Sequence, residues 1–335
     1  MTAANLSYLG KALARKTLWL AVVLLGITLL SFFVIHLAPG SPTDLETTMN
    51  PLADADARER LNALYGLDRP LHEQYFSWLK RMVVLDFGDS MSSDPRPVID
   101  KIAEALPLTL CLNGATLLFT LLIAVPLGVA GAARRNGVFD RITTVLVFVG
   151  FSMPTFWLAL LLMMFFAVDL GWFPLSGLTS LDFQQLSPLG KTLDLLRHLA
   201  MPLLVTVFTG LAGLSRFVRA SVIDALRQDY IMTARAKGLS ERVVLFRHAL
   251  RNALLPVITI LGLSVPGLIG GSVIIESIFA LPGMGQLFYK AVMARDYPLI
   301  MGNLVIGAVL TLAGNLLADL CYGLADPRIR TGTVR

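Results

Sequence analysis

Apolar residues form six runs along the chain, most of them close to the length of about 20 residues that a helix needs to cross a bilayer. Polar stretches separate the runs, and two of these stretches are longer than a simple connection. The pattern predicts an all-α polytopic membrane protein with six transmembrane helices. We expect these helices at residues 18–38, 108–131, 142–168, 200–214, 254–275 and 300–320.

The first long polar stretch, residues 39–107, predicts a small, mainly helical subdomain between the first two transmembrane helices. A short helix is expected at 54–65, a glycine turn at 66–70 and a loop at 86–97. Residues 71–84 predict an amphipathic helix, and 100–106 a helix that leads into the second span. The apolar face of the helix at 71–84 carries Leu71, Tyr75, Trp78, Leu79 and Met82.

The second long polar stretch, residues 216–252, is strongly basic and is called the insert below. It holds eight Lys or Arg residues against three acids. Each basic side chain at a bilayer centre would cost about 2.5–3.5 kcal/mol, which excludes burial of the insert in lipid. Apolar residues nevertheless recur in it at helical spacing. The insert therefore predicts a structured element with an apolar face, suited either to a protein partner or to an anionic lipid surface.

Two helices are expected within the insert, joined at a glycine. The first is predicted at 220–236, with Lys237 and Gly238 as its C-terminal turn. Ser240 is a suitable N-cap for a second helix that begins at Glu241.

Composition supports a membrane protein and gives its orientation. Apolar residues make up 55% of the chain, charged residues only 15%, and the mean hydropathy is +0.69. The net charge of +5 is concentrated at the N-terminus, the 132–141 connection, the insert and the C-terminal tail. Because Lys and Arg collect on cytoplasmic loops, these segments and both termini are predicted to be cytoplasmic, with 39–107 outside. Binding of nucleic acid is excluded, since the charge does not form a basic face on a soluble fold.

The predicted divisions of the chain follow from these segments. Residues 1–38 form an N-terminal segment with the first helix, 39–107 the external subdomain, 108–322 the transmembrane domain and 323–335 a cytoplasmic tail. No nucleophile motif, metal-ligand spacing or nucleotide-binding loop is found, so no catalytic or metal site is expected. A stand-alone channel or secondary carrier stays open as an alternative, although the spans lack the chain of acids and histidines that a proton-coupled carrier needs.

A family resemblance rests on motifs spread over the whole chain. The insert sequence DYIMTARAKGLSERVVLFRHALRNALLPV resembles the cytoplasmic loop of permease subunits in the dipeptide, oligopeptide and nickel family of ABC importers. Other segments resemble that family in the same order. They are LAPGSP, YGLDRPLHEQYFSWL, DFGDS, PLGVAGAARRNGVFDR, FSMPTFWLALLLMMFF, LGWFPLSG, ESIFALPGMGQLFYKAV, RDYPL and YGLADPRIR. The long segment 39–107 is similar to that of the first, B-type subunit of a permease pair.

The resemblance implies a type I ABC importer permease fold in a bacterial inner membrane. The implied partners are a second homologous permease, two ATP-binding subunits, an external substrate-binding protein and membrane lipid. ATP and Mg would be bound by the ATP-binding subunits, and no cofactor by this chain. Dipeptides, oligopeptides, nickel chelates and related solutes remain open as substrates, with peptide expected first.

The resemblance also implies that the insert docks on an ATP-binding subunit. Met232, Thr233 and Ala234 stand where other importers have an acid and two small residues before the glycine, and the nearest acid is Asp229. The residues expected to take part in coupling are Asp229, Thr233, Ala234, Arg235, Ala236, Lys237, Gly238, Val243, Phe246, Arg247 and Arg251. Asn113, Ser152 and Asn303 are candidates for lining the path.

Overall fold

The computed structural model describes residues 3–37, 63, 66–254, 257–258, 260, 264, 266–268 and 270–325, with side chains between 18 and 316. Within these residues the regular secondary structure is helical, apart from one isolated bridge between Asp89 and Pro97. The chain divides into two compact units, residues 1–107 with 287–314, and residues 108–286 with 315–335. The predicted helix at 54–65 and the tail at 326–335 lie outside the described residues, apart from Ala63.

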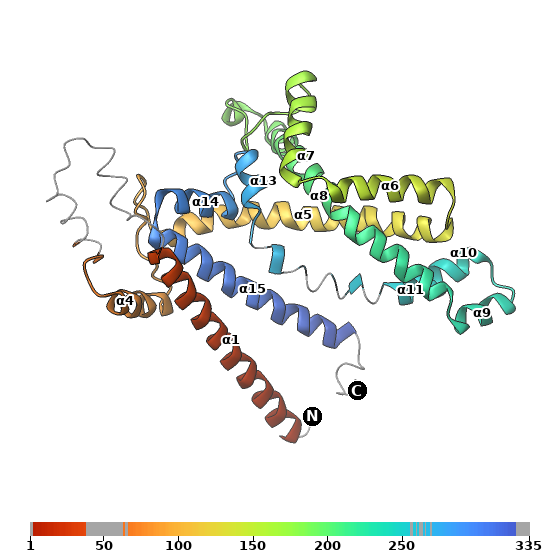
Figure 1. The fold of residues 1–335 in the computed structure, drawn as a ribbon, viewed down its shortest axis with the longest axis horizontal. Coiled ribbons are helices and arrows are strands. Elements are labelled where there is room, and N and C mark those ends of the chain that lie inside the picture. The colour runs from red at the N-terminus through yellow and green to blue at the C-terminus, as the bar shows by residue number, and fades with distance from the viewer. Residues whose placement is uncertain are drawn as a thin grey trace. The chain divides into compact units, whose positions relative to one another are not determined.

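The first unit contains the N-terminal helix, a short amphipathic helix and parts of three others. The helices are α1 (Ala3–Leu37), α4 (Leu71–Val83), the start of α5 (Val98–Ala133), most of α14 (Met284–Ala294) and the first part of α15 (Tyr297–Ala325) (Figure 1). The hydroxyls of Thr28 and Tyr75 are 3.0 Å apart, and the ring of Phe32 packs edge-on against Tyr75. These contacts hold the predicted amphipathic helix against α1. They confirm Tyr75, Trp78 and Leu79 on its inward face, whereas Leu71 is 44% exposed.

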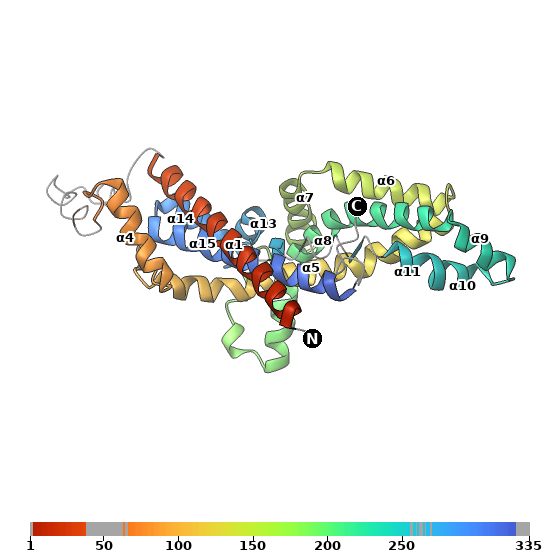
Figure 2. The same ribbon diagram turned by 90° about the horizontal axis from the view of Figure 1, so that it is seen from below.

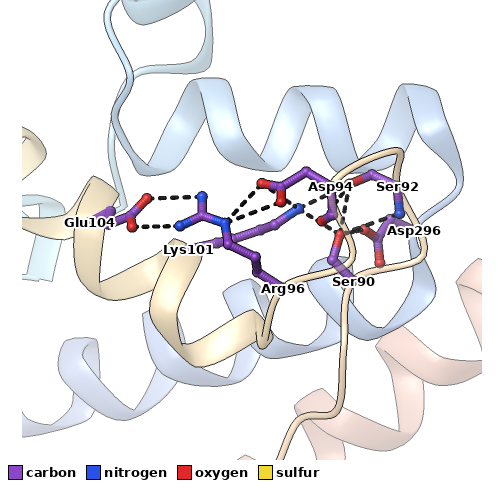
Figure 3. A network of polar contacts seen from close by, with 7 residues as sticks. All are labelled: Ser90, Ser92, Asp94, Arg96, Lys101, Glu104 and Asp296. Carbon is purple, nitrogen blue, oxygen red and sulfur yellow. Dashed lines mark hydrogen bonds and ion pairs between the residues drawn. The ribbon is translucent and has the colours of Figure 1, made fainter.

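A buried polar network ties the predicted 86–97 loop to α5 and to the turn before α15 (Figure 3). The ammonium of Lys101 donates to the hydroxyls of Ser90 and Ser92 at 2.8 and 2.9 Å, and Ser90 donates to Asp296 at 2.5 Å. Arg96 bridges the carboxylates of Asp94 and Glu104 on the exposed side. Because Lys101 and Asp296 are buried and share Ser90, their charges are compensated inside the unit.

The second unit is built on long helices that run side by side. They are the remainder of α5, α6 (Val138–Ser152) and α8 (Pro188–Leu226) (Figures 1 and 2). Gly128 and Gly150 permit the close approach, since a side chain there would meet Val218 and Phe208 respectively at 2.7 Å. Ser187 caps α8 by accepting from the Gly190 N–H at 3.2 Å, and Pro188 follows at the first helical position.

Shorter elements complete the second unit. They are α7 (Thr155–Leu162), η1 (Met163–Asp169), η2 (Phe183–Gln185), α9 (Asp229–Ala236), α10 (Glu241–Val243), η3 (Val244–Ala249), α11 (Leu250–Ala253), η4 (Pro266–Leu268) and α13 (Val273–Ile278). In both views α9, α10 and α11 lie together at the end of α8 (Figures 1 and 2).

Four described helices are long and apolar enough to cross a membrane, at Leu18–Leu37, Val98–Ala133, Pro188–Leu226 and Tyr297–Leu316. They coincide with the first, second, fourth and sixth predicted spans. The fifth predicted span, 254–275, falls mostly outside the described residues. The count of six and the orientation therefore stay predictions.

The third predicted span, 142–168, corresponds to a bent pair of helices. The chain bends by 104° between Val138–Ser152 and Thr155–Asp169. Pro154 explains the break, because a proline disfavours helical backbone at the preceding residue, and Met153 is extended, with ψ 130°. With the bent pair counted as one, the spans number five among the described residues.

Candidate functional site

The insert turns sharply at Gly238, as the sequence predicts. Gly238 has φ +77°, in the left-handed region that glycine adopts without strain, and its N–H donates to the Arg235 carbonyl at 2.9 Å. Lys237 is the C-cap residue that follows α9, and the N–H of Leu239 reaches back to the Ala234 carbonyl. The glycine therefore ends one helix and redirects the chain into the next.

The second insert helix begins at Glu241, which confirms the predicted start. Ser240 occupies the N-cap position with extended backbone, but its hydroxyl makes no capping hydrogen bond. The helix continues through the π-helical turn Val244–Ala249 into α11. A π turn rotates the side chains that follow it relative to an ordinary α-helix, and such turns are frequent at functional sites.

The first insert helix was predicted at 220–236, and this is wrong. The residues up to Leu226 continue α8, the chain becomes extended at Gln228 (ψ 151°), and α9 begins at Asp229. The helical periodicity of the sequence continues across Arg227 and Gln228, because alanines and apolar residues lie on both sides of them. No proline or glycine marks the break between the two helices, so the sequence predicted one helix. The break lets α9 fold back, so the insert is rooted directly in a transmembrane helix.

The inner face of the insert shares its core with the transmembrane helices. Ile231 of α9 and Val244 of η3 are fully buried, in one cluster with Val218 and Val222 of α8 and Val129 of α5. Ala234, expected to serve close packing in the coupling element, is buried in this cluster and packs inward. The insert is thus part of the helical unit and is not a separate appendage.

The outer face of the insert exposes large apolar side chains. Met232 is 64% exposed, Phe246 55%, Leu239 38% and Val243 37%. Phe246 and Val243 were expected here, whereas Met232 and Leu239 were not. In the sequence Met232 differs little from its buried neighbour Ile231, and only the break before α9 decides which of the two faces outward.

An ion pair spans the turn between the two insert helices. The guanidinium of Arg235 donates from Nε and Nη2 to the two carboxylate oxygens of Glu241, at 2.7 and 3.0 Å. These hydrogen bonds lower the pKa of Glu241 and raise that of Arg235. The pair is exposed to solvent and contributes little to the stability of the fold. Its effect is to fix the angle between the two insert helices at the Gly238 turn.

The remaining predicted coupling residues lie on the exposed surface of the insert. Asp229 is the first residue of α9, and Thr233 donates its hydroxyl to the Asp229 carbonyl at 3.1 Å. This orientation leaves the Thr233 side chain near the helix surface. The exposed members of the predicted set are Asp229, Thr233, Arg235, Ala236, Lys237, Gly238, Val243, Phe246, Arg247 and Arg251.

The three candidate path residues lie in different places. Asn113 lines a cavity of about 490 Å³ with Thr116, Thr120 and Ser264, and its amide donates to the Leu268 carbonyl at 2.9 Å. Ser152 is exposed at the end of α6 and donates to the Phe148 carbonyl. Asn303 is buried in α15, in the first unit. Among the described residues Asn113 and Ser152 therefore line two separate, mainly apolar cavities, and Asn303 lines neither of them.

Two buried ionic groups of the second unit were missed as functional candidates. Asp140 accepts from Arg219 Nε and Nη2 at 2.6 and 2.7 Å, which ties α6 to α8. Glu276 accepts from the Thr109 hydroxyl at 3.0 Å and the Gln286 N–H at 2.9 Å. The available signal was one acidic residue near the end of a predicted span in each case, but the hydrogen-bond partners lie 79 and 167 residues away, where periodicity cannot find them.

Among the described residues no group of three or more His, Cys, Asp or Glu side chains is arranged to hold a metal ion. The exposed surface of the insert instead combines apolar and basic side chains, a composition that suits either a protein partner or an anionic lipid surface.

Known protein families match nearly the whole chain. Residues 124–331 match the binding-protein-dependent transport system inner membrane component, and residues 9–113 match the N-terminal component of such proteins. The oligopeptide transport system permease protein AppB of Bacillus subtilis is 45% identical over 315 residues, covering 94% of this chain and 98% of that protein.

Two further matches agree with these. The di/tripeptide transport system permease protein DppB of Pseudomonas aeruginosa is 38% identical over 334 residues, covering 95% of this chain and 98% of that protein. A solved inward-facing structure of the MetNI methionine ABC transporter is similar in fold, with a TM-score of 0.51 and 18% identity, over 71% of this chain and 98% of that one.

Proposed function

We propose that this chain, which belongs to the family of binding-protein-dependent transport system inner membrane components, forms half of a solute path and couples it to ATP hydrolysis through the insert. The chain is a permease of a peptide ABC importer and a multi-pass protein of the inner membrane. We further propose which surface of the chain contacts the ATP-binding subunits and which residues line the solute path.

One observation carries the proposal, namely the two-sided insert. Its inner face is buried with α5 and α8, while Met232, Leu239, Val243 and Phe246 stay exposed among basic side chains. Exposed clusters of large apolar residues mark interaction sites, and a rigid connection to transmembrane helices lets a docked partner move them. A loose loop with the same outer face could bind a partner but could not transmit its motion.

The proposed partners are two ATP-binding subunits, a second permease homologous to this one and an external substrate-binding protein. In that arrangement ATP and Mg are bound by the ATP-binding subunits, and this chain takes no part in hydrolysis. When those subunits close on ATP they displace the inserts, and the transmembrane helices joined to the inserts move as rigid bodies.

The proposed substrate class is di- and oligopeptides, because the permeases AppB and DppB carry those names at 45% and 38% identity. For the path itself we propose Asn113, with Ser152 and Asn303 as further candidates. The cavity at Asn113 supports this assignment through its neutral hydroxyl and amide groups, which match the hydrogen-bonding groups of a peptide backbone.

The experiment that tests the function is ATP-dependent uptake of a labelled peptide by the complete complex in proteoliposomes. Met232→Glu places a charge on the proposed docking surface and should lower both uptake and co-purification of the ATP-binding subunits. Leu181→Glu is the matched control, since Leu181 is fully exposed outside the insert. Uptake by this chain alone, without ATP, would instead support a stand-alone channel or carrier.

The exposed basic surface of the insert also suits anionic lipid, and the same variant separates the two functions. Loss of flotation with anionic liposomes, with co-purification of the ATP-binding subunits unchanged, would favour a lipid surface.

A further inference from the structure

The pair formed by Asp140 and Arg219 lies where α6 meets the root of the insert. Arg219 belongs to α8, one residue after Val218 of the insert's core cluster, and Asp140 lies in the first turn of α6. Both guanidinium hydrogen bonds are short, and Asp140 is only 4% exposed. The pair is therefore a bidentate contact between α6 and α8 in which the carboxylate is buried and the Arg219 side chain is 31% exposed.

The same carboxylate also fixes the connection between α5 and α6. Asp140 accepts from the Asn136 N–H at 2.9 Å, and Asn136 is held in the left-handed region at φ +63°. Gly131 of α5 lies alongside, because a side chain there would approach Asp140 at 3.3 Å and Arg219 at 3.4 Å. One acid thus joins the end of α5, the start of α6 and α8 at a single point.

The core cluster of the insert leaves α6 out. It draws its buried residues from α5, α8, α9, η3, α11 and Val257, and none from α6. Near its far end, α6 packs on α8 at Gly150 against Phe208, three residues before the bend at Met153 and Pro154. The ion pair is therefore a polar contact that attaches the start of α6 to α8, and through α8 to the core of the insert.

We propose that Asp140 and Arg219 are positioning residues that make α6 move with the insert, so that displacement of the insert reaches the bend between α6 and α7. This inference rests on the proposed function, because it assumes that a docked ATP-binding subunit moves the insert. This role requires no contact of either side chain with solute or nucleotide. Their role is to hold α6 in a fixed position relative to α8 when the insert moves α8.

The test uses the complete complex in lipid, with Asp140→Asn and Arg219→Lys. Asparagine keeps the size and an acceptor oxygen but removes the charge, and lysine keeps the charge but not the bidentate geometry. We expect the ATP-binding subunits to co-purify and basal ATP hydrolysis to stay unchanged. Uptake per ATP hydrolysed should fall by a factor of roughly 2 to 30, the range of coupling changes caused by such mutations, with the lysine variant nearer the wild type.

A distance measurement separates this role from a merely structural one. Spin labels at Val145→Cys on α6 and Arg242→Cys on the insert, both exposed, are introduced after replacing Cys111 and Cys321. In the otherwise unaltered complex the distance should be the same without nucleotide and with ATP trapped, and in Asp140→Asn the trapped state should broaden or shift. Asp182→Asn, an exposed acid outside the pair, should behave as the unaltered complex does.

The outcomes distinguish the two proposals. A label distance that changes between the two states of the unaltered complex, while the ATP-binding subunits co-purify, overturns the positioning role and leaves the proposed function standing. An unchanged uptake per ATP in Asp140→Asn also overturns the role. Failure of the ATP-binding subunits to associate with the unaltered chain overturns both.

Discussion

Arg235 and Glu241 face each other across the glycine turn of the insert, with two hydrogen bonds of 2.7 and 3.0 Å between guanidinium and carboxylate. The pair links the end of α9 to the start of the second insert helix. It therefore sets the angle at which Met232 and Phe246 are presented on either side of the turn.

The turn between the two insert helices should become more mobile in acid. Arg235 lowers the pKa of Glu241 below its ordinary value of 4.5, so the ion pair contributes above that pH and is lost as the pH falls through the lowered pKa. We expect spin labels at Met232 and Phe246 to report a broader distance distribution once the pH has fallen through this lowered pKa. Glu241→Gln should show the broad distribution at neutral pH with little further change in acid; an identical pH dependence in that variant would contradict the assignment.

Replacement of Gly238 should weaken coupling while the protein still enters the membrane. Alanine at φ +77° is strained by about 1–2 kcal/mol. Proline fixes φ near −65° and removes the N–H that donates to the Arg235 carbonyl, so Gly238→Pro should be the more severe change. The measurement is substrate-stimulated ATP hydrolysis of the purified complex, and normal stimulation in Gly238→Pro would contradict the role of the turn.

Val244 and Phe246 are two residues apart and should respond oppositely to the same substitution. Val244 is fully buried in the insert's core, so Val244→Asp should lower the amount of folded protein in the membrane, because a buried charge without a partner is strongly destabilising. Phe246→Asp should leave that amount unchanged and reduce co-purification of the ATP-binding subunits. Equal losses of folded protein in the two variants would show that Phe246 is a core residue and not a docking residue.

Glu276 should be a stability residue of the second unit. Its carboxylate accepts from the Thr109 hydroxyl and from the N–H groups of Gln286 and Ser272. Glu276→Ala leaves these donors without their acceptor, at about 1–3 kcal/mol for each that stays buried. We expect the melting temperature in detergent to fall by at least about 3 °C. Asp182→Asn is the control, and a melting temperature equal to that of the control would remove Glu276 from this role.

Much of the architecture could be predicted from the sequence because bilayer spans leave a length and composition signal. Four predicted spans coincide with apolar helices, and the glycine stop at Gly238 and the helix start at Glu241 follow from local backbone preferences. These features depend on residues that are neighbours in the chain, so local sequence preferences are enough to predict them.

Features set by distant contacts could not be predicted. The break at Gln228 has no proline or glycine to announce it, and packing of Ile231 and Ala234 on α8 decides it. The bend at Pro154 had a visible signal, but apolar periodicity alone treated the segment as one span. The partners of Asp140 and Glu276 come from other helices, so their pairing appears only in the folded chain.

The central claim is that the outer face of the insert is where an ATP-binding subunit docks, and site-specific photo-cross-linking tests it most directly. A benzophenone amino acid at Phe246, with a second sample carrying it at the exposed Leu181, is irradiated in membranes that contain the whole complex. We predict a cross-link from position 246 to an ATP-binding subunit and none from position 181. A complex that transports peptide yet gives no such cross-link from position 246 would contradict the account.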